Sequence, residues 1–321
     1  MKDMKKIHQP PQVDDGYQAL LSAVKKSGMP IIGSVSAVEM RAWQAAMLPM
    51  LPPGPEVGYV EDCAIPSSTG AIPARLYRPK DPARALMVFF HGGGWTIGSL
   101  DGWDAALRRL VLACGCAILS VDYRLAPEHP FPAAVDDAVT ATRWALGNVS
   151  ALALANVPVV VAGDSAGGNL SAVVSRVLAE EGASPALAAQ ILIYPSTDGD
   201  IDSPAMHRFE SPFLTREEIA WFYSQYIPDR RQRRDPRFAP LHAPRVDGLP
   251  PALVLTAECD LFSEDGLAYA ERLRSEGVHT RVRRFEGGIH GFFTMDRGQL
   301  PHSGQAMAEI SDFLTEVLGP K

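Results

Sequence analysis

The chain has 321 residues, of which 46% are hydrophobic, and it carries a formal net charge of −7. This length supports one large core, either in a single domain or in a domain with a cap. The acidic balance and the lack of a basic patch argue against a nucleic-acid partner. The polar segment 1–8 differs from a signal peptide, and no apolar run is long enough to span a bilayer. We therefore expect a soluble, cytoplasmic protein without a membrane span.

The four cysteines argue against both a disulfide framework and a metal site. They are Cys63, Cys114, Cys116 and Cys259, and no two of them have C-x-x-C spacing. Cys114 and Cys116 could bind a metal together, but they precede a run that is typical of a buried strand. We expect these two to pack in the core, and we expect no metal or other cofactor.

Residues 1–55 form an N-terminal section with two predicted helices. Residues 17–26 and 36–47 have helical patterns, and several prolines between residues 49 and 55 then mark a linker. The spacing in the second helix predicts one shared face, formed by Val38, Trp43, Ala46 and Met47. The Met and Trp side chains either pack against neighbouring helices or form the roof of a pocket, and the sequence leaves both interpretations open.

From residue 56 onward, apolar strands alternate with helices. The predicted strands are residues 59–65, 71–77, 86–90, 117–121, 157–162, 189–193, 252–257 and 279–285. The predicted helices are residues 105–113, 133–146, a segment around 170–178, then 265–275 and 307–318. The first two strands flank a turn and predict a hairpin, whereas most later strands are continuous apolar runs. The pattern predicts an α/β fold with a mostly parallel central sheet and helices on both faces.

The alternation is interrupted between residues 196 and 240. This stretch is rich in aromatic residues, shows no clear strand, and contains one predicted helix at residues 217–225. Its arginine run, residues 230–234, is typical of a solvated face. We interpret the stretch as an insertion over the edge of the sheet.

The segment 163–169, Gly-Asp-Ser-Ala-Gly-Gly-Asn, lies between a predicted strand and a predicted helix. A G-x-S-x-G sequence alone is weak evidence, because small residues also form ordinary turns. Between a strand and a helix it predicts a nucleophile elbow, a tight turn that needs glycine at 163 and 167 and exposes the hydroxyl of Ser165. The N–H of Ala166 would then lie at the helix N-terminus, where negative charge is stabilised.

A serine nucleophile needs a base, and the base needs an orienting acid. On this kind of sheet both follow the serine along the chain, each on a loop after a strand. Among the eight histidines, His290 follows the last predicted strand and has glycines on both sides, which favours it as the base. His129 precedes Ser165, and we expect it to be structural.

The acid is predicted by its position after strand 252–257. Asp260 follows that strand directly, at the end where such sheets place their sites. Glu258, Glu264 and Asp265 are nearby alternatives, and we expect Asp265 to cap or open the next helix. Asp260 is therefore the preferred acid.

The loop His91-Gly92-Gly93-Gly94 follows the predicted strand 86–90. Consecutive glycines allow bare N–H groups to approach a substrate closely, as in the H-G-G-G loop of lipases and esterases. We expect Gly92, Gly93 and Gly94, together with Ala166, to stabilise an oxyanion. His91 is expected to hold this loop in place by hydrogen bonding.

Several stretches together resemble the hormone-sensitive-lipase-like branch of the α/β-hydrolases, also called bacterial family IV esterases. They are residues 91–95, 122–128, 163–169, 192–195 and 289–292. The paired H-G-G-G and G-D-S-A-G-G motifs are highly specific, and the similarity extends over residues 56–318. The N-terminal section matches only in kind, since family members carry a helical cap there.

The resemblance implies an α/β-hydrolase fold with a helical cap, made of an N-terminal segment, residues 1–55, and the insertion 196–240 within a catalytic domain, residues 56–321. The family's catalytic serine, aspartate and histidine match Ser165, Asp260 and His290. Members often form homodimers through a sheet edge and typically prefer short or medium acyl chains. This chain departs from the family in lacking a proline after Asp260, where Leu261 and Phe262 follow. The departure suggests altered pocket walls near the catalytic residues.

The sequence thus predicts a serine carboxylesterase that acts on short- to medium-chain esters of small molecules, with Trp95 and the cap aromatics as candidate pocket walls. The same triad would also serve an amide, formamide or carbamate hydrolase. A third interpretation is a protein that binds small ligands without catalysis, as happens in relatives that lose a triad member. All three triad members are present here.

Overall fold

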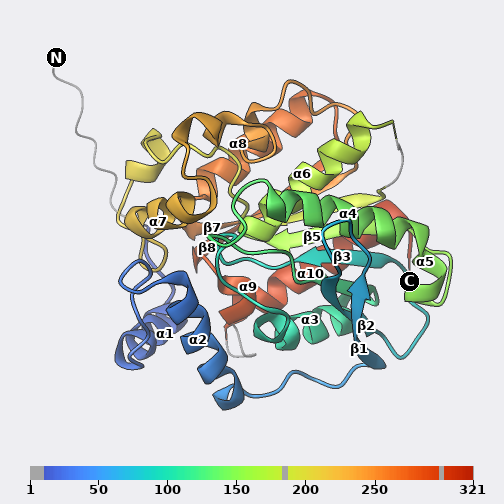
Figure 1. Cartoon of the computed structure of the whole chain (residues 1–321), viewed down its shortest axis with the longest axis horizontal. Coiled ribbons are helices and arrows are strands. Elements are labelled where there is room, and N and C mark those ends of the chain that lie inside the picture. The colour runs from blue at the N-terminus through green and yellow to red at the C-terminus, as the bar shows by residue number, and fades with distance from the viewer. Residues whose placement is uncertain (1–10, 183–186, 296–299, 321) are drawn as a thin grey trace.

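The computed structural model describes residues 11–182, 187–295 and 300–320. Its centre is one eight-stranded sheet in the order β1-β2-β4-β3-β5-β6-β7-β8 (Figure 1). The strands are β1 (Tyr59–Ile65), β2 (Ile72–Arg78), β3 (Leu86–Phe90), β4 (Ala117–Val121), β5 (Val159–Asp164), β6 (Ala189–Ile193), β7 (Ala252–Cys259) and β8 (Thr280–Ile289). β1 and β2 form the expected antiparallel hairpin, β2 is antiparallel to β4, and the remaining pairs are parallel. The predicted α/β fold is confirmed.

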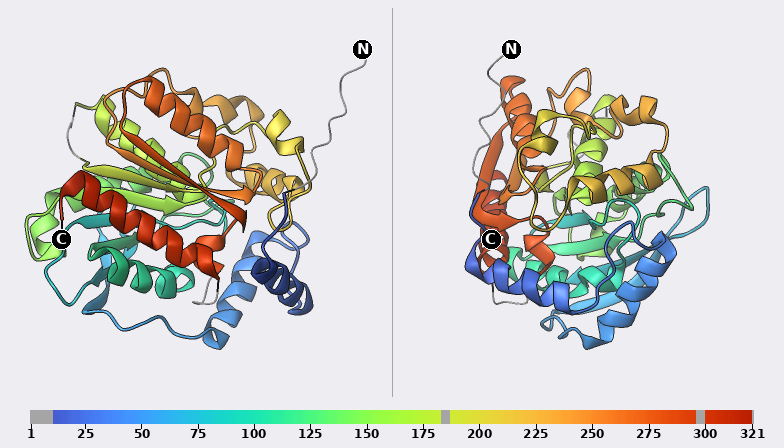
Figure 2. Two further views of the ribbon diagram at one scale, coloured as in Figure 1. Left: turned by 180° about the vertical axis from the view of Figure 1, so that it is seen from behind. Right: turned by 90° about the vertical axis from the view of Figure 1, so that its left-hand side faces the viewer.

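Helices cover both faces of this sheet (Figures 1 and 2). One face packs against α3 (Leu100–Cys114) and α10 (Pro301–Leu318). The other packs against α4 (Ala133–Gly147), α6 (Ala166–Glu180) and α8 (Ser263–Ser275). The central strand β3 contributes side chains to the cores on both faces of the sheet. Leu86, Val88 and Phe90 pack on the side of α4 and α6, whereas Met87 and Phe89 pack on the side of α3. Burial on both faces explains why this strand is a continuous apolar run.

Several helix boundaries differ from the predicted ones. α3 begins five residues before the predicted start because the hydroxyl of Ser99 accepts a hydrogen bond from Gly102 N at 3.2 Å and caps the helix. α10 begins at Pro301 rather than at residue 307. The short helices α5 (Val149–Ala153) and α9 (Phe292–Met295) were not predicted, because a segment of one turn has no periodic pattern to detect.

Three helices lie together at one end of the sheet: α1 (Asp15–Lys26), α2 (Ala37–Met47) and α7 (Arg216–Tyr226) (Figures 1 and 2). Short 3₁₀ turns lie at residues 48–50, 204–207, 230–234 and 240–242, and the third contains the arginine run on the surface. None of the helices in the described ranges is long and apolar enough to cross a membrane.

The shared face predicted for α2 is correct in part, because Trp43 and Met47 are half-buried while Val38 and Ala46 are exposed. Ala37 and Met40 are the buried residues of this helix, whereas Val38 is 58% exposed and Ala46 is also exposed. The orientation follows from Arg41, whose guanidinium donates to the carbonyl oxygens of Thr96 at 2.9 Å and of Ala126 at 3.1 Å. These two bonds turn the face of Ala37, Met40 and Arg41 inward, which hydrophobic spacing alone does not reveal.

Candidate active site

Ser165 lies in a strained turn between β5 and α6. Its backbone has φ +57° and ψ −116°, a conformation that is costly for a residue with a side chain. The turn is so tight that a Cβ at Gly167 would lie 1.9 Å from the carbonyl oxygen of Phe90, and a Cβ at Gly163 would lie 2.3 Å from Gly167. The geometry is that of the predicted nucleophile elbow, in which only glycine fits on either side of the serine.

The structure brings Ser165, His290 and Asp260 into one hydrogen-bonded chain. The hydroxyl of Ser165 lies 2.9 Å from Nε2 of His290, and Nδ1 of His290 lies 2.7 Å from Oδ2 of Asp260. The serine comes from the turn after β5, the aspartate follows β7 and the histidine follows β8. Because a carboxylate only accepts, Nδ1 of His290 donates to Asp260 and leaves Nε2 free to accept from the serine hydroxyl. This order of contacts suits proton transfer from Ser165 to His290.

The other candidate acids contact different groups. Glu258 accepts a hydrogen bond from Gly287 N at 3.0 Å, and Glu264 forms an ion pair with Arg208. Asp265 lies in the first turn of α8, as expected, but its side chain does not cap that helix. Its carboxylate instead accepts from the backbone N–H groups of Thr197 and Asp198 at 3.3 and 3.2 Å. Burial raises the pKa of Asp265 to about 7.

The expected donor role of Gly92 is wrong. Its N–H donates to Oδ1 of Asp164 at 2.9 Å and is therefore not available to a substrate. Gly93 and Gly94 follow with φ of +105° and +59°, which glycine adopts without strain. Within the described ranges no protein acceptor contacts the N–H groups of Gly93, Gly94 or Ala166, and these three residues border the cavity beside Ser165. They remain candidate oxyanion donors.

Asp164 holds the glycine loop beside Ser165, a position that the sequence analysis did not single out. It is buried and accepts from three neutral donors: Gly92 N, Nε1 of Trp103 at 2.7 Å and the hydroxyl of Tyr194 at 3.3 Å. Burial raises its pKa to about 6, because these neutral donors only partly offset the lost hydration. The sequence does contain a signal for this position. Asp164 is a charged residue inside a motif of small residues, and an ordinary tight turn does not require a charge there.

His91 holds the glycine loop, as predicted. Its ring is fully buried, its Nδ1 donates to Gly92 O at 2.7 Å, and its carbonyl oxygen accepts from the hydroxyl of Tyr123 at 2.7 Å. Burial lowers the pKa of His91 to about 4, so the ring is neutral at neutral pH. A neutral imidazole committed to its own loop is poorly placed to act as a base.

A cavity of about 230 Å³ opens above Ser165. Its walls are mostly apolar and include Met29, Met40, Trp43, Phe213, Phe222 and Phe262. The ring of Phe262, which stands two residues after Asp260, borders this cavity and lies 5.6 Å from the ring of His290. Trp95 also borders the cavity, although its indole is mainly packed against Tyr226, with ring centroids 4.8 Å apart.

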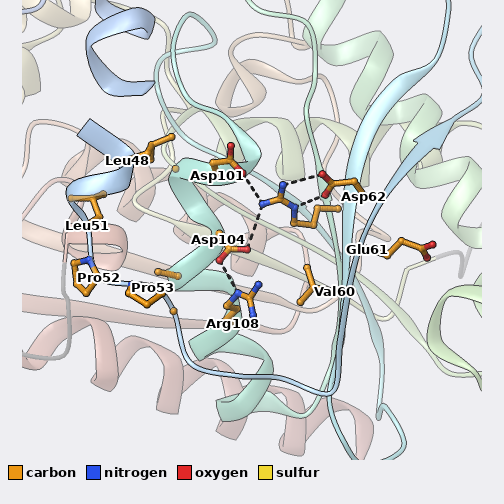
Figure 3. Close-up of a pocket in the computed structure, with 14 residues that line it drawn as sticks. Leu48, Leu51, Pro52, Pro53, Val60, Glu61, Asp62, Asp101, Asp104 and Arg108 are labelled. Carbon is orange, nitrogen blue, oxygen red and sulfur yellow. Dashed lines mark hydrogen bonds and ion pairs between the residues drawn. The ribbon is translucent and has the colours of Figure 1, made fainter. Parts of the chain in front are cut away.

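A second cavity of about 640 Å³ lies between the proline-rich linker, β1 and α3 (Figure 3). We call it the Arg75 groove. The guanidinium of Arg75 contacts the carboxylates of Asp62, of Asp101 at 2.8 Å and of Asp104 at 3.5 Å, and Arg108 also pairs with Asp104 (dashed lines in Figure 3). The polar side chains of the groove are thus bonded mainly to one another. No cluster of His, Cys, Asp or Glu suited to a metal ion occurs in the described part of the chain.

Comparisons with known proteins agree with this geometry. Residues 87–294 match the family model described as alpha/beta hydrolase fold. The carboxylic ester hydrolase LipN of Mycobacterium tuberculosis is 42% identical over 296 residues, which cover 88% of this chain and 77% of the relative. An ethyl acetate hydrolase of Pseudomonas putida is 38% identical over 242 residues, covering 74% of this chain and 76% of the relative.

A solved structure with the same architecture is the hyperthermophilic esterase of the archaeon Pyrobaculum calidifontis. It aligns with a TM-score of 0.86 at 33% identity and covers 96% of this chain and 100% of its own. Both the sequence relatives and this structural neighbour are ester hydrolases by name. The chain therefore belongs to the α/β-hydrolase fold family, in its hormone-sensitive-lipase-like branch, and is a carboxylic ester hydrolase.

Proposed function

We propose that the protein is a serine esterase that forms an acyl-enzyme on Ser165. The observation that carries the proposal is the chain of contacts from Ser165 Oγ to His290 Nε2, at 2.9 Å, and from His290 Nδ1 to Asp260 Oδ2, at 2.7 Å. His290 takes the proton of Ser165 as the hydroxyl attacks the ester carbonyl. Asp260 keeps the imidazole in the tautomer that accepts this proton and stabilises the imidazolium that forms.

The remaining steps use the same residues. The N–H groups of Gly93, Gly94 and Ala166 stabilise the negative charge that develops on the carbonyl oxygen. His290 then protonates the leaving alcohol, so that the C–O bond breaks and the acyl group stays on Ser165. A water molecule, deprotonated by His290, attacks the acyl-enzyme and releases the carboxylic acid. These steps use no metal ion or cofactor.

The size of the cavity supports short- to medium-chain substrates. Its volume of about 230 Å³ is smaller than the roughly 300–1,000 Å³ of pockets that hold drug-sized ligands. Its apolar lining favours a neutral acyl group, because a second charge would lose its hydration without gaining a partner. Esters of short acids therefore fit this cavity better than long-chain lipids do.

We also propose that residues 1–55 and the insertion 196–240 act as a cap on the catalytic domain, residues 56–321. The N-terminal section contributes Met29, Met40 and Trp43 to the cavity, and the insertion contributes Phe222. Both segments therefore take part in selecting the substrate.

The cytoplasmic location stays a prediction. A homodimer through an edge of the sheet, at β1 or β8, is also proposed, and light scattering of the purified protein tests it.

The test is hydrolysis of p-nitrophenyl esters from acetate to laurate by the wild type and by Ser165→Ala. We expect activity that is highest for short or medium chains and falls by about 10⁴-fold or more in the variant. Circular dichroism of the variant checks that its fold is intact. Wild-type rates in Ser165→Ala would refute the nucleophile, and a maximum at laurate would refute the chain-length proposal while leaving the nucleophile in place.

A further inference from the structure

Two neighbouring aromatic residues of α7 reach two different loops. The ring of Phe222 lies directly on Gly94, where a Cβ would meet it at 2.3 Å. The indole of Trp221 lies on Gly33, between α1 and α2, where a Cβ would meet it at 3.2 Å. Helix α7 thus contacts the loop of candidate oxyanion donors through one residue and the N-terminal section through the next.

Helix α7 is firmly held where it makes these contacts. Thr215 and Glu218 form a capping box at its start, with Thr215 N donating to the Glu218 carboxylate at 2.8 Å. Tyr223 is buried and its hydroxyl lies 2.9 Å from the hydroxyl of Ser196. Phe222, between them, is only 6% exposed. The ring of Phe222 is therefore buried on a helix that is anchored on both sides of it.

The loop under this ring is held on its inner side by hydrogen bonds, since Gly93 O accepts from Thr96 N at 3.1 Å and from Ile97 N at 3.0 Å. Gly93 and Gly94 have no side chains, and glycine loses more conformational freedom on ordering than any other residue. The loop is held from below by the bond between Gly92 N and Asp164, and Gly94 O accepts from the hydroxyl of Thr96 at 2.9 Å. On the side of the cavity, the ring of Phe222 contacts Gly94.

We propose that Phe222 is a positioning residue for ester hydrolysis, and that Trp221 instead controls access to the cavity by holding the N-terminal section. Phe222 presses on Gly94 and keeps the N–H groups of Gly93 and Gly94 aimed at the developing oxyanion. Donors that are already oriented cost no reorganisation during the reaction, so their loss lowers kcat more than it raises KM. The inference rests on the proposed function, because it assumes an oxyanion at this loop.

The experiment compares Phe222→Ala, Phe222→Leu and Trp221→Ala in steady-state hydrolysis of p-nitrophenyl acetate and hexanoate. For Phe222→Ala we expect kcat on acetate to fall by at least about tenfold with little change in KM, and Phe222→Leu to recover part of the loss. For Trp221→Ala we expect the reverse, a raised KM with kcat retained. Binding of a butylboronic acid, which mimics the tetrahedral intermediate, should weaken in parallel with kcat in the Phe222 series only.

The outcomes separate this inference from its alternatives. If Phe222→Ala raises KM alone, or if hexanoate restores kcat by filling the enlarged cavity, then Phe222 merely lines the pocket and the inference is overturned. If Trp221→Ala lowers kcat as much as Phe222→Ala does, the contact with Gly94 has no special role, which also overturns it. Phe222→Leu serves as the decisive variant if Phe222→Ala does not fold. Failure of the proposed function is seen separately, as activity that survives Ser165→Ala.

Discussion

The Arg75 groove and the cavity beside Ser165 use their polar groups in opposite ways. The groove is the larger of the two, at about 640 Å³ against about 230 Å³. Yet the carboxylates of its three aspartates, Asp62, Asp101 and Asp104, are bonded to Arg75 and Arg108. The smaller cavity keeps a serine hydroxyl with an acceptor for its proton, beside backbone N–H groups that have no protein acceptor in the described ranges. The reactive site therefore differs from the structural groove in having polar groups that are free to bond a substrate, and not in having a larger volume.

The carboxylates of the two regions also differ in their charge environment. In the groove, the hydrogen bond from Arg75 holds the pKa of Asp62 below its ordinary value. Under the catalytic cavity, burial raises the pKa of Asp164 to about 6, since its partners are neutral donors. A carboxylate paired with a cation stabilises the fold in its charged form, whereas one buried among neutral donors is destabilising when charged.

Among the changes that compare the two regions, the largest effect is expected from Asp260→Asn, beside the catalytic cavity. The amide keeps the size of the carboxylate but no longer holds His290 in the tautomer that accepts from Ser165. We expect kcat on p-nitrophenyl acetate to fall by about 10³- to 10⁴-fold. Glu258→Gln is the matched control, because its amide oxygen can still accept from Gly287 N, and near wild-type activity is expected. A large loss in the control and none in Asp260→Asn would move the acid to Glu258.

The second prediction uses pH to compare Asp164 with Asp62. Because the folded-state pKa of Asp164 is raised, the folded protein binds more protons than the unfolded one between about pH 4 and 6, so stability falls as pH rises through that range. Asp164→Asn removes this effect. We expect its free energy of unfolding, relative to wild type, to increase by up to about 3 kcal/mol from pH 4 to pH 7.

Asp62→Asn should show the opposite trend. The lowered pKa of Asp62 means that its contribution is present above its ordinary pKa and is lost as pH falls through the lowered value. The variant should therefore lose a little stability relative to wild type as pH rises, with a small effect because the side chain is 65% exposed. Urea unfolding at several pH values measures both differences. Parallel trends for the two variants would contradict the contrast between the regions.

The smallest effect is expected from Arg75→Ala in the groove. Its ion pairs have partly exposed partners, so we expect a loss of about 1 kcal/mol in the free energy of unfolding. The loss should shrink in 1 M salt, which screens such pairs. The kcat/KM on p-nitrophenyl acetate should stay unchanged. A strong loss of activity in a folded variant would show that the groove takes part in catalysis and would end the comparison.

Much of the fold follows from local patterns in the sequence. The buried strands are apolar runs, their order relative to the helices predicts a parallel sheet, and the glycines around Ser165 predict a tight turn. Asp260 and His290 were singled out because each follows a strand, and parallel strands end at the same edge of a sheet. The structure places both side chains in contact distance of one another, with His290 at Ser165.

Other features depend on partners that are distant in the sequence. The N–H of Gly92 donates to Asp164, which lies 72 residues further along, and so cannot serve as the expected oxyanion donor. Arg41 orients α2 by donating to the carbonyl oxygens of Thr96 and Ala126. The contact of Phe222 with Gly94 likewise joins the insertion to a loop far earlier in the chain. The sequence alone thus determined the elements and the order of the reactive residues, because backbone conformation and hydrophobic burial are encoded locally. Only the tertiary structure decided which N–H groups remain free and which faces touch, because each hydrogen bond and each contact is allocated among all the groups that the fold brings together.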